Sequence, residues 1–228
     1  MRPLDFLRLL FKGPTPKMMA AQLRRPSGMI AKKVGERMNA ANRFLYDATW
    51  KALQLDDGMN VLEIGFGNGL FFPELAAKAK DLKLSGLDFS EAMMKEAQAR
   101  NPALVKSEAL ALHFGSSEKM QFADGSFDRV YCINVVYFWE NPTAHLLEVK
   151  RVLKPGGRFV AALRTKATMD TMAFSRYGFI KYEHAEWETL LRSNGFNTIH
   201  TERVQEPEIE FEGVRYTPES LVVTAGFA

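Results

Sequence analysis

The sequence is poor in the residues that build disulfides and metal sites. It holds one cysteine, Cys132, and four histidines, at positions 113, 145, 184 and 200. A single cysteine excludes an internal disulfide, and the histidine spacing matches no pattern of metal ligands. We therefore expect an inert buried cysteine, no metal site and a reducing compartment, the cytoplasm.

Long apolar runs are absent as well. No segment approaches the roughly 18 uninterrupted apolar residues of a membrane span, and the opening MRPLDFLRLLF is interrupted by Asp5 and Arg8. No small-residue cleavage site follows it, so neither secretion nor membrane spanning is expected. What remains is a chain of 228 residues, 46% hydrophobic and 25% charged, which is enough for one sizeable core.

Positive charge is concentrated in the first part of the chain. Residues 1–60 carry 11 Lys and Arg against 5 Asp and Glu, whereas residues 61–228 carry 19 against 22. Such a segment can attract nucleic acid, a lipid surface or an acidic substrate, but a solvated helix face has the same composition. Because the basic residues alternate with apolar ones and no RNA-binding module is recognisable, we expect no stable nucleic-acid complex. Weak contact of the N-terminus with a membrane surface stays open.

From residue 57 onward, short β-like runs alternate with helical patterns. Strands are predicted at 59–64, 82–88, 110–114, 128–134, 157–163, 197–204 and 220–227, and helices at 70–80, 90–100, 143–153 and 183–196. Strands that alternate with helices form a parallel sheet covered on both faces, so the pattern predicts a doubly wound α/β fold.

A glycine-rich turn follows the first predicted strand, in VLEIGFGNG. Gly65, Gly67 and Gly69 are spaced G-x-G-x-G, whereas a dinucleotide site usually has G-x-G-x-x-G. Glu63 stands just before them, where a carboxylate repels a pyrophosphate and favours an ammonium group. The loop therefore suits a zwitterion better than a diphosphate.

Asp88 ends the second predicted strand, 19 residues after Gly69. An acid at this place typically accepts hydrogen bonds from the hydroxyls of a ribose. A ribose and an amine without a pyrophosphate indicate S-adenosylmethionine as the ligand.

Four segments then carry a family resemblance: VLEIGFGNG, GLDFS, FADGSFDRVYCINVVYFWENP and EVKRVLKPGGRF. In this order they resemble the successive motifs of class I S-adenosylmethionine-dependent methyltransferases, particularly the bacterial small-molecule branch that includes the quinone-biosynthesis C-methyltransferases. The resemblance covers residues 57–165 well. It implies a Rossmann-like, seven-stranded, mostly parallel sheet with an antiparallel last strand.

The resemblance also implies roles for individual residues. The backbone at Gly65, Gly67 and Gly69 would hold the methionine part, Glu63 would support its ammonium group directly or through water, and Asp88 would hold the ribose.

The adenine end of the site departs from the family. Phe89 would pack on the adenine, although an ordinary buried aromatic is the alternative. Where the family commonly has GDA, this chain has GSSEKM, so Ser116 replaces the acid. The Ser116 hydroxyl and the Ser117 amide can still meet the adenine, or both serines only make a turn.

The end of the fourth predicted strand should lie under the sulfonium. Asn134 is expected to contact the cofactor, and Tyr137 and Trp139 the acceptor, with aromatic faces stabilising the sulfonium charge; core packing is the alternative for these rings. No catalytic base can be assigned, and His145 is expected on a helix surface.

The acceptor should be covered by two segments outside the cofactor motifs. Residues 1–56 are predicted to form a helical cap with a break at 25–28, and residues 57–228 the S-adenosylmethionine-binding domain. The second cover is 164–182, where Arg164 and Tyr177 would suit a carboxylate or phosphate on the acceptor, unless Arg164 merely pairs with an acid.

These features together predict a cytoplasmic methyltransferase that uses S-adenosylmethionine and acts on a small molecule. An RNA or protein methyltransferase and a non-catalytic S-adenosylmethionine-binding protein are the alternatives, because cofactor motifs report binding rather than turnover.

Overall fold

The structure is a computed structural model that describes residues 14–211 and 213–227. Its helices are α2 (Pro16–Arg24), α3 (Ala31–Leu53), α4 (Phe72–Ala76), α5 (Glu91–Arg100), α6 (Pro102–Lys106), α7 (Pro142–Val152), α8 (Lys166–Thr171) and α9 (His184–Ser193). Its strands are β1 (Asn60–Ile64), β2 (Lys83–Asp88), β3 (Leu110–Phe114), β4 (Phe127–Ile133), β5 (Leu153–Arg164), β6 (Thr198–Gln205), β7 (Ile209–Phe211), β8 (Val214–Tyr216) and β9 (Glu219–Gly226). Short 3-10 turns are η1 (Gly28–Ile30), η2 (Val136–Phe138) and η3 (Ala173–Arg176).

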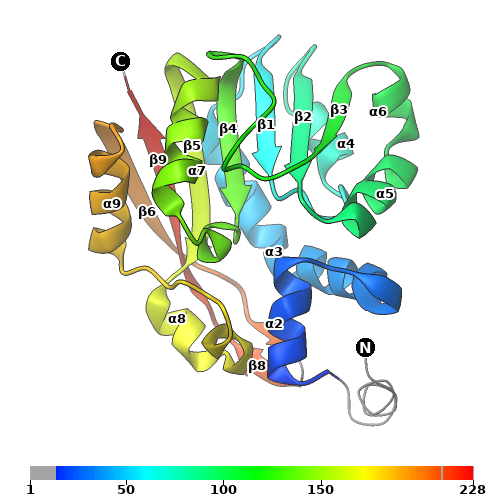
Figure 1. The fold of residues 1–228 in the computed structure, drawn as a ribbon, viewed down its shortest axis with the longest axis vertical. Coiled ribbons are helices and arrows are strands. Elements are labelled where there is room, and N and C mark those ends of the chain that lie inside the picture. The colour runs from blue at the N-terminus through cyan, green and yellow to red at the C-terminus, as the bar shows by residue number, and fades with distance from the viewer. Residues whose placement is uncertain (1–13, 212, 228) are drawn as a thin grey trace.

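Seven of the strands form one sheet in the order β3-β2-β1-β4-β5-β9-β6. Strands β1 to β5 pair in parallel, and β9, the last strand of the chain, is antiparallel to both of its neighbours. The sheet with its covering helices is visible in Figure 1. This topology confirms the predicted Rossmann-like, mostly parallel sheet with an antiparallel last strand.

Each face of the sheet has its own hydrophobic core. On β4, Val130 and Cys132 point into one core, which α2, α7 and α9 complete, while Tyr131 and Ile133 point into the other, with α3, α4 and α5. The alternation follows from the period of two along a strand. Cys132 is fully buried, as expected, and burial raises the pKa of its thiol above the usual range.

The N-terminal segment forms the predicted helices and the predicted break between them. Thr15 caps α2, since its hydroxyl accepts from the main-chain N–H of Met18 at 3.2 Å. The C-terminal half of α3 packs on the sheet through buried residues such as Leu45 and Leu53. This segment thus contributes to the core. That residues 1–56 form a unit of their own stays a prediction, and a membrane contact of the first residues falls outside the described part of the chain.

The helix predicted at 70–80 is shorter in the structure. It begins at Phe72, with Pro73 in its first turn, and ends at Ala76. The following residues instead form a turn in which the N–H of Lys80 donates to Asp57 at 2.8 Å. These residues thus hydrogen-bond to the segment before β1 instead of continuing the helix.

A β-hairpin of β7 and β8 was not expected from the sequence. Its strands have three residues each and turn near Gly213, which has a φ of 76°. Strands this short fall below the length at which alternation is informative.

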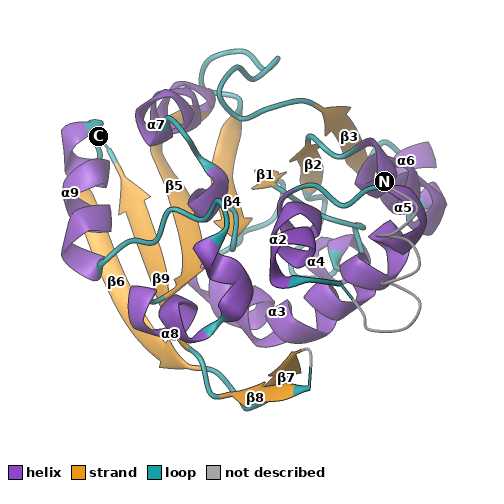
Figure 2. Cartoon of the chain, turned by 60° about the horizontal axis from the view of Figure 1, so that its bottom comes forward, coloured by secondary structure: helices purple, strands orange, loops and turns teal. Residues whose placement is uncertain are grey.

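The carboxyl ends of the parallel strands point toward α2, α8 and the hairpin (Figure 1), and in a tilted view these elements surround the strand ends (Figure 2). Ligands bind at this edge in doubly wound sheets. Among residues 14–211 and 213–227, no helix has the length and apolar character needed to cross a membrane.

Candidate cofactor and acceptor site

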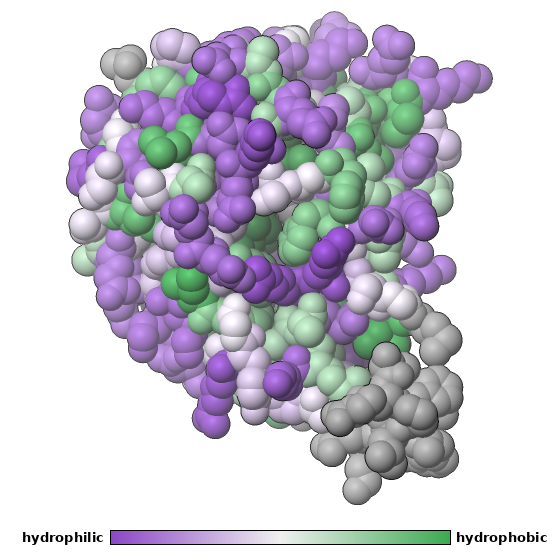
Figure 3. Space-filling model, viewed as in Figure 1, coloured by the Kyte–Doolittle hydropathy of each residue, from purple (hydrophilic) through white to green (hydrophobic). Residues whose placement is uncertain are grey.

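A cavity of about 240 Å³ lies at the carboxyl ends of β1, β2 and β4. Its walls come from the loops after β1, β2, β3 and β4 and from α2, α3, α5 and α7. The space-filling view shows apolar surface in a hollow of this face, bordered by hydrophilic residues (Figure 3). Of the predicted site residues, the cavity is lined by Gly65, Gly67, Asp88, Phe89, Ser116, Ser117, Asn134 and Trp139.

The glycine loop contributes main chain to this wall. Gly65 and Gly67 have φ values of 76° and 59°, the left-handed region that favours glycine. A Cβ on Gly65 would clash with the side chain of Val135, whereas Gly67 faces open space. Gly69 does not line the cavity; a Cβ there would lie 2.7 Å from the Cβ of Ala97 on α5. Its position fits close packing of the loop against α5 rather than ligand contact.

Asp88 ends β2 and anchors the glycine loop. Its Oδ2 accepts from the N–H of Gly67 at 3.0 Å, and its Oδ1 accepts from the N–H of Ser90 at 2.8 Å. Burial raises the pKa of this carboxyl to about 6, although both hydrogen bonds oppose the shift. Each oxygen retains a lone pair toward the cavity, so Asp88 can still accept from a hydroxyl.

Glu63 lies behind the cavity rather than in its wall. Its carboxylate is almost fully buried and accepts from the hydroxyls of Tyr46 and Tyr131, each at 2.7 Å. Burial raises its pKa to about 7. Tyr46, from α3, stands in the cavity wall between Glu63 and the open space. Direct contact of Glu63 with an ammonium group therefore does not follow from this arrangement, and Tyr46 takes the place at the wall.

The two serines after β3 lie in different surroundings. Ser116 is exposed, and its Oγ accepts from the N–H of Glu118 at 3.3 Å in a local turn. Ser117 is buried, and its Oγ lies 2.7 Å from Nδ1 of His145. The ring of His145 stacks on Trp139, with centroids 4.7 Å apart. The expectation that His145 lies on a helix surface is wrong, because it is 6% exposed and lines the cavity.

Phe89 stands at the open side of the same region. It lines the cavity and is only partly buried, so it is not an ordinary core residue. The guanidinium of Arg25 lies 5.6 Å from the centre of its ring. One side of the Phe89 ring thus contacts the N-terminal segment.

A second, smaller cavity of about 60 Å³ adjoins the first. Most of its wall is apolar, from α2, α3, η2, α8, η3 and β7. The residues that line it are Leu23, Met38, Ala41, Asn42, Asn134, Tyr137, Phe138, Arg164, Met169, Met172, Phe174, Phe179 and Ile209. It includes two of the predicted acceptor residues, Tyr137 and Arg164.

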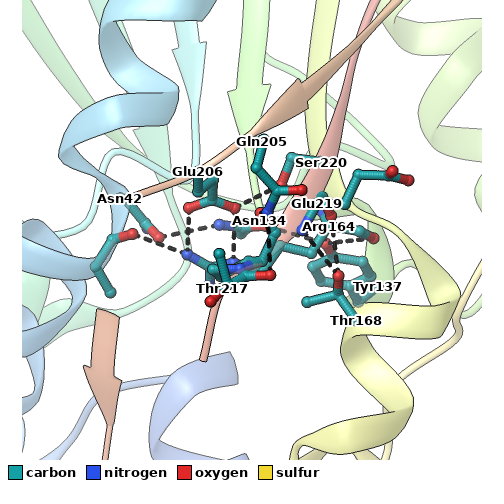
Figure 4. A network of polar contacts seen from close by, with 12 residues as sticks. Asn42, Asn134, Tyr137, Arg164, Thr168, Gln205, Glu206, Thr217, Glu219 and Ser220 are labelled. Carbon is teal, nitrogen blue, oxygen red and sulfur yellow. Dashed lines mark hydrogen bonds and ion pairs between the residues drawn. The ribbon is translucent and has the colours of Figure 1, made fainter. Parts of the chain in front are cut away.

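Asn134 stands where the two cavities meet. It has a φ of 57°, which is uncommon outside glycine, directly after β4. Its Nδ2 donates to Oδ1 of Asn42 at 3.0 Å, and its Oδ1 accepts from the Tyr137 hydroxyl at 3.0 Å. Both ends of the side chain are therefore fixed (Figure 4).

Arg164 is not available to an anion on the acceptor. Its Nε and Nη2 donate to the two oxygens of Glu206 at 3.0 and 2.9 Å, and Nη2 also donates to the carbonyl of Ala41 at 2.8 Å (Figure 4). Ser220 donates to Glu206 at 2.6 Å, and both charged residues are buried. The predicted anion-binding role is corrected here: the charge of Arg164 is already compensated, by a buried acid.

Tyr177, the other predicted acceptor contact, lines neither cavity. It is 46% exposed, in the turn after η3. The chain turns at Gly178, with a φ of 75°, and Phe179 after this turn lines the second cavity whereas Tyr177 before it does not. No sequence pattern predicts which of the two side chains points inward.

Asn68, a residue of the wall of the first cavity, also has an unpaired donor. Nδ2 of Asn68 is buried without a partner among the described residues, while its Oδ1 accepts from Asn39 at 3.0 Å. A buried N–H needs an acceptor such as a carboxylate oxygen, and Asp88 offers acceptors to hydroxyl groups. The residues present therefore fit S-adenosylmethionine, which carries a carboxylate and a ribose. No cluster of metal ligands occurs within the described ranges.

Similarity to known proteins agrees with this site. The family described as "Methyltransferase domain" matches residues 62–161. The chain is 30% identical over 157 residues to the uncharacterized methyltransferase YdaC of Bacillus subtilis, covering 67% of this chain and 84% of YdaC. It is 29% identical to the demethylmenaquinone methyltransferase of Symbiobacterium thermophilum, of which it covers 64%, with 70% of this chain aligned.

The fold is shared with a chain of the complex between the Haloferax volcanii Trm112 methyltransferase activator and a methyltransferase. The TM-score is 0.75 at 19% identity, covering 92% of this chain and 97% of the other. The chain belongs to the class I S-adenosylmethionine-dependent methyltransferases, as the order of its motifs predicted.

Proposed function

We propose that this protein binds S-adenosylmethionine in the first cavity and transfers its methyl group to a small molecule held in the second. The observation that carries the proposal is the junction of the two cavities. Both are lined by Leu23, Met38, Asn42, Asn134 and Phe138. A cofactor and an acceptor in adjoining spaces meet at this junction, as an in-line transfer requires.

The acceptor is uncharged and largely apolar. Met169 and Met172 are buried in the wall of the second cavity, together with aromatic rings. Among the described residues of that wall, Arg164 is the one charged group, and it is paired with Glu206, so a charged acceptor would enter an apolar space without a free counter-charge. The side chains that can form polar contacts with the acceptor are those of Asn42 and Asn134.

The acceptor must also bring its own nucleophile. The wall of the second cavity holds no carboxylate or imidazole among the described residues. The two amides are not bases, and burial raises the pKa of the Tyr137 hydroxyl well above its usual value. The cofactor supplies an electrophilic methyl group when bound. Residues of this chain hold the two partners in place, and the attacking atom has its lone pair available before it binds. The methylated atom carries the positive charge after the transfer and then loses its proton to water, which gives a neutral product.

The relatives support a small molecule as acceptor, since one of them is a demethylmenaquinone methyltransferase. A cytoplasmic location remains part of the proposal. Methylation of RNA or protein and binding without turnover remain the competing readings, and each has a distinct outcome in the test.

The test uses the whole protein and S-adenosylmethionine labelled in its methyl group. Incubation with a metabolite extract of the source organism should transfer label to a neutral product that partitions into organic solvent. Ala41→Leu fills the second cavity and should lower turnover by tenfold or more, about 1.4 kcal/mol, while binding of S-adenosylhomocysteine stays unchanged. Ala40→Leu is the matched control, because Ala40 is exposed on the same helix and lines neither of the two cavities.

Label that appears only in RNA or protein would contradict the small-molecule acceptor. Binding of S-adenosylhomocysteine without any labelled product would favour the non-catalytic alternative. Equal turnover by both leucine variants would show that the acceptor does not use the second cavity.

A further inference from the structure

A buried polar pair in the wall of the first cavity has no role in the transfer described above. Ser117 and His145 are each 6% exposed and lie on the loop after β3 and the first turn of α7. Their side chains meet at 2.7 Å, between Ser117 Oγ and His145 Nδ1. The Trp139 ring stacks on the imidazole at an interplanar angle of 7°, so the ring of His145 is held in one orientation.

The surroundings of the imidazole decide which of its nitrogens carries the proton. Oε1 of Glu118 lies 3.3 Å from Nε2 of His145. The negative charge of this carboxylate favours the tautomer with the hydrogen on Nε2, which leaves Nδ1 as the acceptor. Burial lowers the pKa of His145 to about 4, so the ring is neutral near pH 7. Ser117 therefore donates its only hydrogen to Nδ1.

The direction of this bond fixes the character of Ser117 toward a ligand. With its hydrogen engaged, Oγ presents only lone pairs to the cavity. The main chain places it beside the nucleoside position, because Asp88 pairs with Phe114 across β2 and β3 and the N–H of Gly115 donates to the Asp88 carbonyl at 3.0 Å. A base attached to a ribose at Asp88 can reach the Ser117 loop, two residues further on.

We propose that Ser117, oriented by His145, accepts a hydrogen bond from the exocyclic amino group of the adenine and selects a 6-aminopurine over a 6-oxopurine. This rests on the proposed function, since it assumes that the first cavity holds the cofactor. A 6-oxopurine turns a carbonyl oxygen toward the lone pairs of Ser117, and a site built for an N–H group discriminates strongly against such a ligand. His145 is a positioning residue that acts through Ser117. Ser116, exposed and engaged with Glu118, does not take this role.

Calorimetry with two ligands tests the pair. S-adenosylhomocysteine and S-inosylhomocysteine differ at the 6-position and in the N1 proton, and the ratio of their dissociation constants is the measured quantity. The wild type should prefer the amino compound by about tenfold or more. Ser117→Ala should bring the ratio to within about threefold of unity, because the acceptor oxygen is gone.

Two histidine variants separate orientation from packing. In His145→Ala the Ser117 hydroxyl turns freely and donates to the 6-oxo group, so the ratio should also collapse. His145→Asn places an amide near the position of Nδ1 and should restore part of the preference. Ser116→Ala tests the neighbouring serine and should keep the wild-type ratio; Ser107→Ala, which is exposed and lines neither of the two cavities, is the control.

The outcomes for the inference and for the proposed function differ. A wild-type ratio kept by both Ser117→Ala and His145→Ala, with folding verified by circular dichroism, would overturn the role of the pair. A shift of the ratio by Ser116→Ala alone would move the contact to the neighbouring serine and overturn it too. A wild type that binds neither compound would overturn the proposed function, and this inference with it.

Discussion

The two cavities are built from different kinds of structure. The first takes much of its wall from main chain and short loops at the ends of consecutive strands, with Asp88 holding the loop at Gly67. The second takes its wall from side chains of α2, α3, η2, α8, η3 and β7, which are far apart in the chain. The cofactor side is therefore encoded in local motifs, and the acceptor side depends on how distant segments pack.

The polar groups of the two cavities follow the same division. In the first, the wall residue Asn68 has an Nδ2 without a partner among the described residues. In the second, the polar groups bond to each other, as Asn134 does with Asn42 and Tyr137. A site whose polar groups are already paired selects its ligand mainly by shape and apolar contact.

The largest effect should come from breaking the buried ion pair of Arg164 and Glu206 beside the second cavity. Glu206→Ala leaves the buried guanidinium of Arg164 without its partner, which should lower the free energy of unfolding by about 3–5 kcal/mol. Urea unfolding measures the change. Glu208→Ala is the control, because Glu208 and its partner Arg215 are both exposed and lie 3.6 Å apart. Loss of this exposed pair should lower the free energy of unfolding by less than about 1 kcal/mol. Similar effects of the two variants would refute the importance of the buried pair.

A pH-dependent effect should come from Glu63, behind the first cavity. Its pKa is raised from 4.5 to about 7 in the folded protein, so the folded state binds a proton more tightly than the unfolded state. Stability from this group is present below pH 4.5 and is lost as pH rises through 7, by up to about 3 kcal/mol.

Asp88, with its pKa also raised, adds a change in the same direction up to about pH 6. Glu63→Gln isolates the first contribution, because it keeps an acceptor for one tyrosine and cannot ionise. Unfolding free energies of both proteins from pH 5 to 8 should differ in slope. Parallel curves would show that Glu63 ionises normally.

On the cofactor side, Asp88→Ala should weaken S-adenosylhomocysteine binding by about 1.5–3 kcal/mol, because it removes a charged acceptor and releases the glycine loop. Calorimetry gives the value. Asp47→Ala is the control, since Asp47 is an exposed acid on α3. An unchanged affinity for Asp88→Ala would mean that the ribose lies elsewhere.

The smallest effect concerns an ion pair in the wall of the first cavity. Arg24 of α2 bonds to Glu140 beside η2 at 2.6 Å, and both are exposed. Arg24→Gln should change cofactor affinity by less than about 1 kcal/mol, and 0.5 M salt should remove the difference because exposed pairs are screened. A larger or salt-insensitive loss would assign Arg24 a direct contact with the ligand.

The division between the cavities also explains what the sequence could predict. Strand patterns and local motifs were enough for a parallel α/β sheet and the places of Gly65, Gly67 and Asp88, and the resemblance to the family implied the antiparallel last strand. The partner of Arg164 lies 42 residues further on, and no local pattern connects the two. Whether Tyr177 or Phe179 points toward the second cavity depends on the conformation of the turn at Gly178.

Two residues of the first cavity were missed although a signal was present. His145 precedes Val149 and Val152 by four and seven residues, which places it on the buried face of α7. Tyr46 has the same relation to Trp50 and Leu53 on α3. The helical period thus indicates that both side chains are buried. It does not predict their partners Ser117 and Glu63, which come from other elements.

The late position of Glu206 has a consequence for synthesis on the ribosome. The residues that line the first cavity end at His145, so all of them have been made before Arg164. The partner of Arg164, Glu206, is made later, and so is β9, which pairs with residues 159–164 of β5. The nascent chain has an uncompensated guanidinium until Glu206 has been translated and an unpaired strand edge until β9 has been translated. The acceptor cavity is thus completed last, after the cofactor cavity has all of its parts.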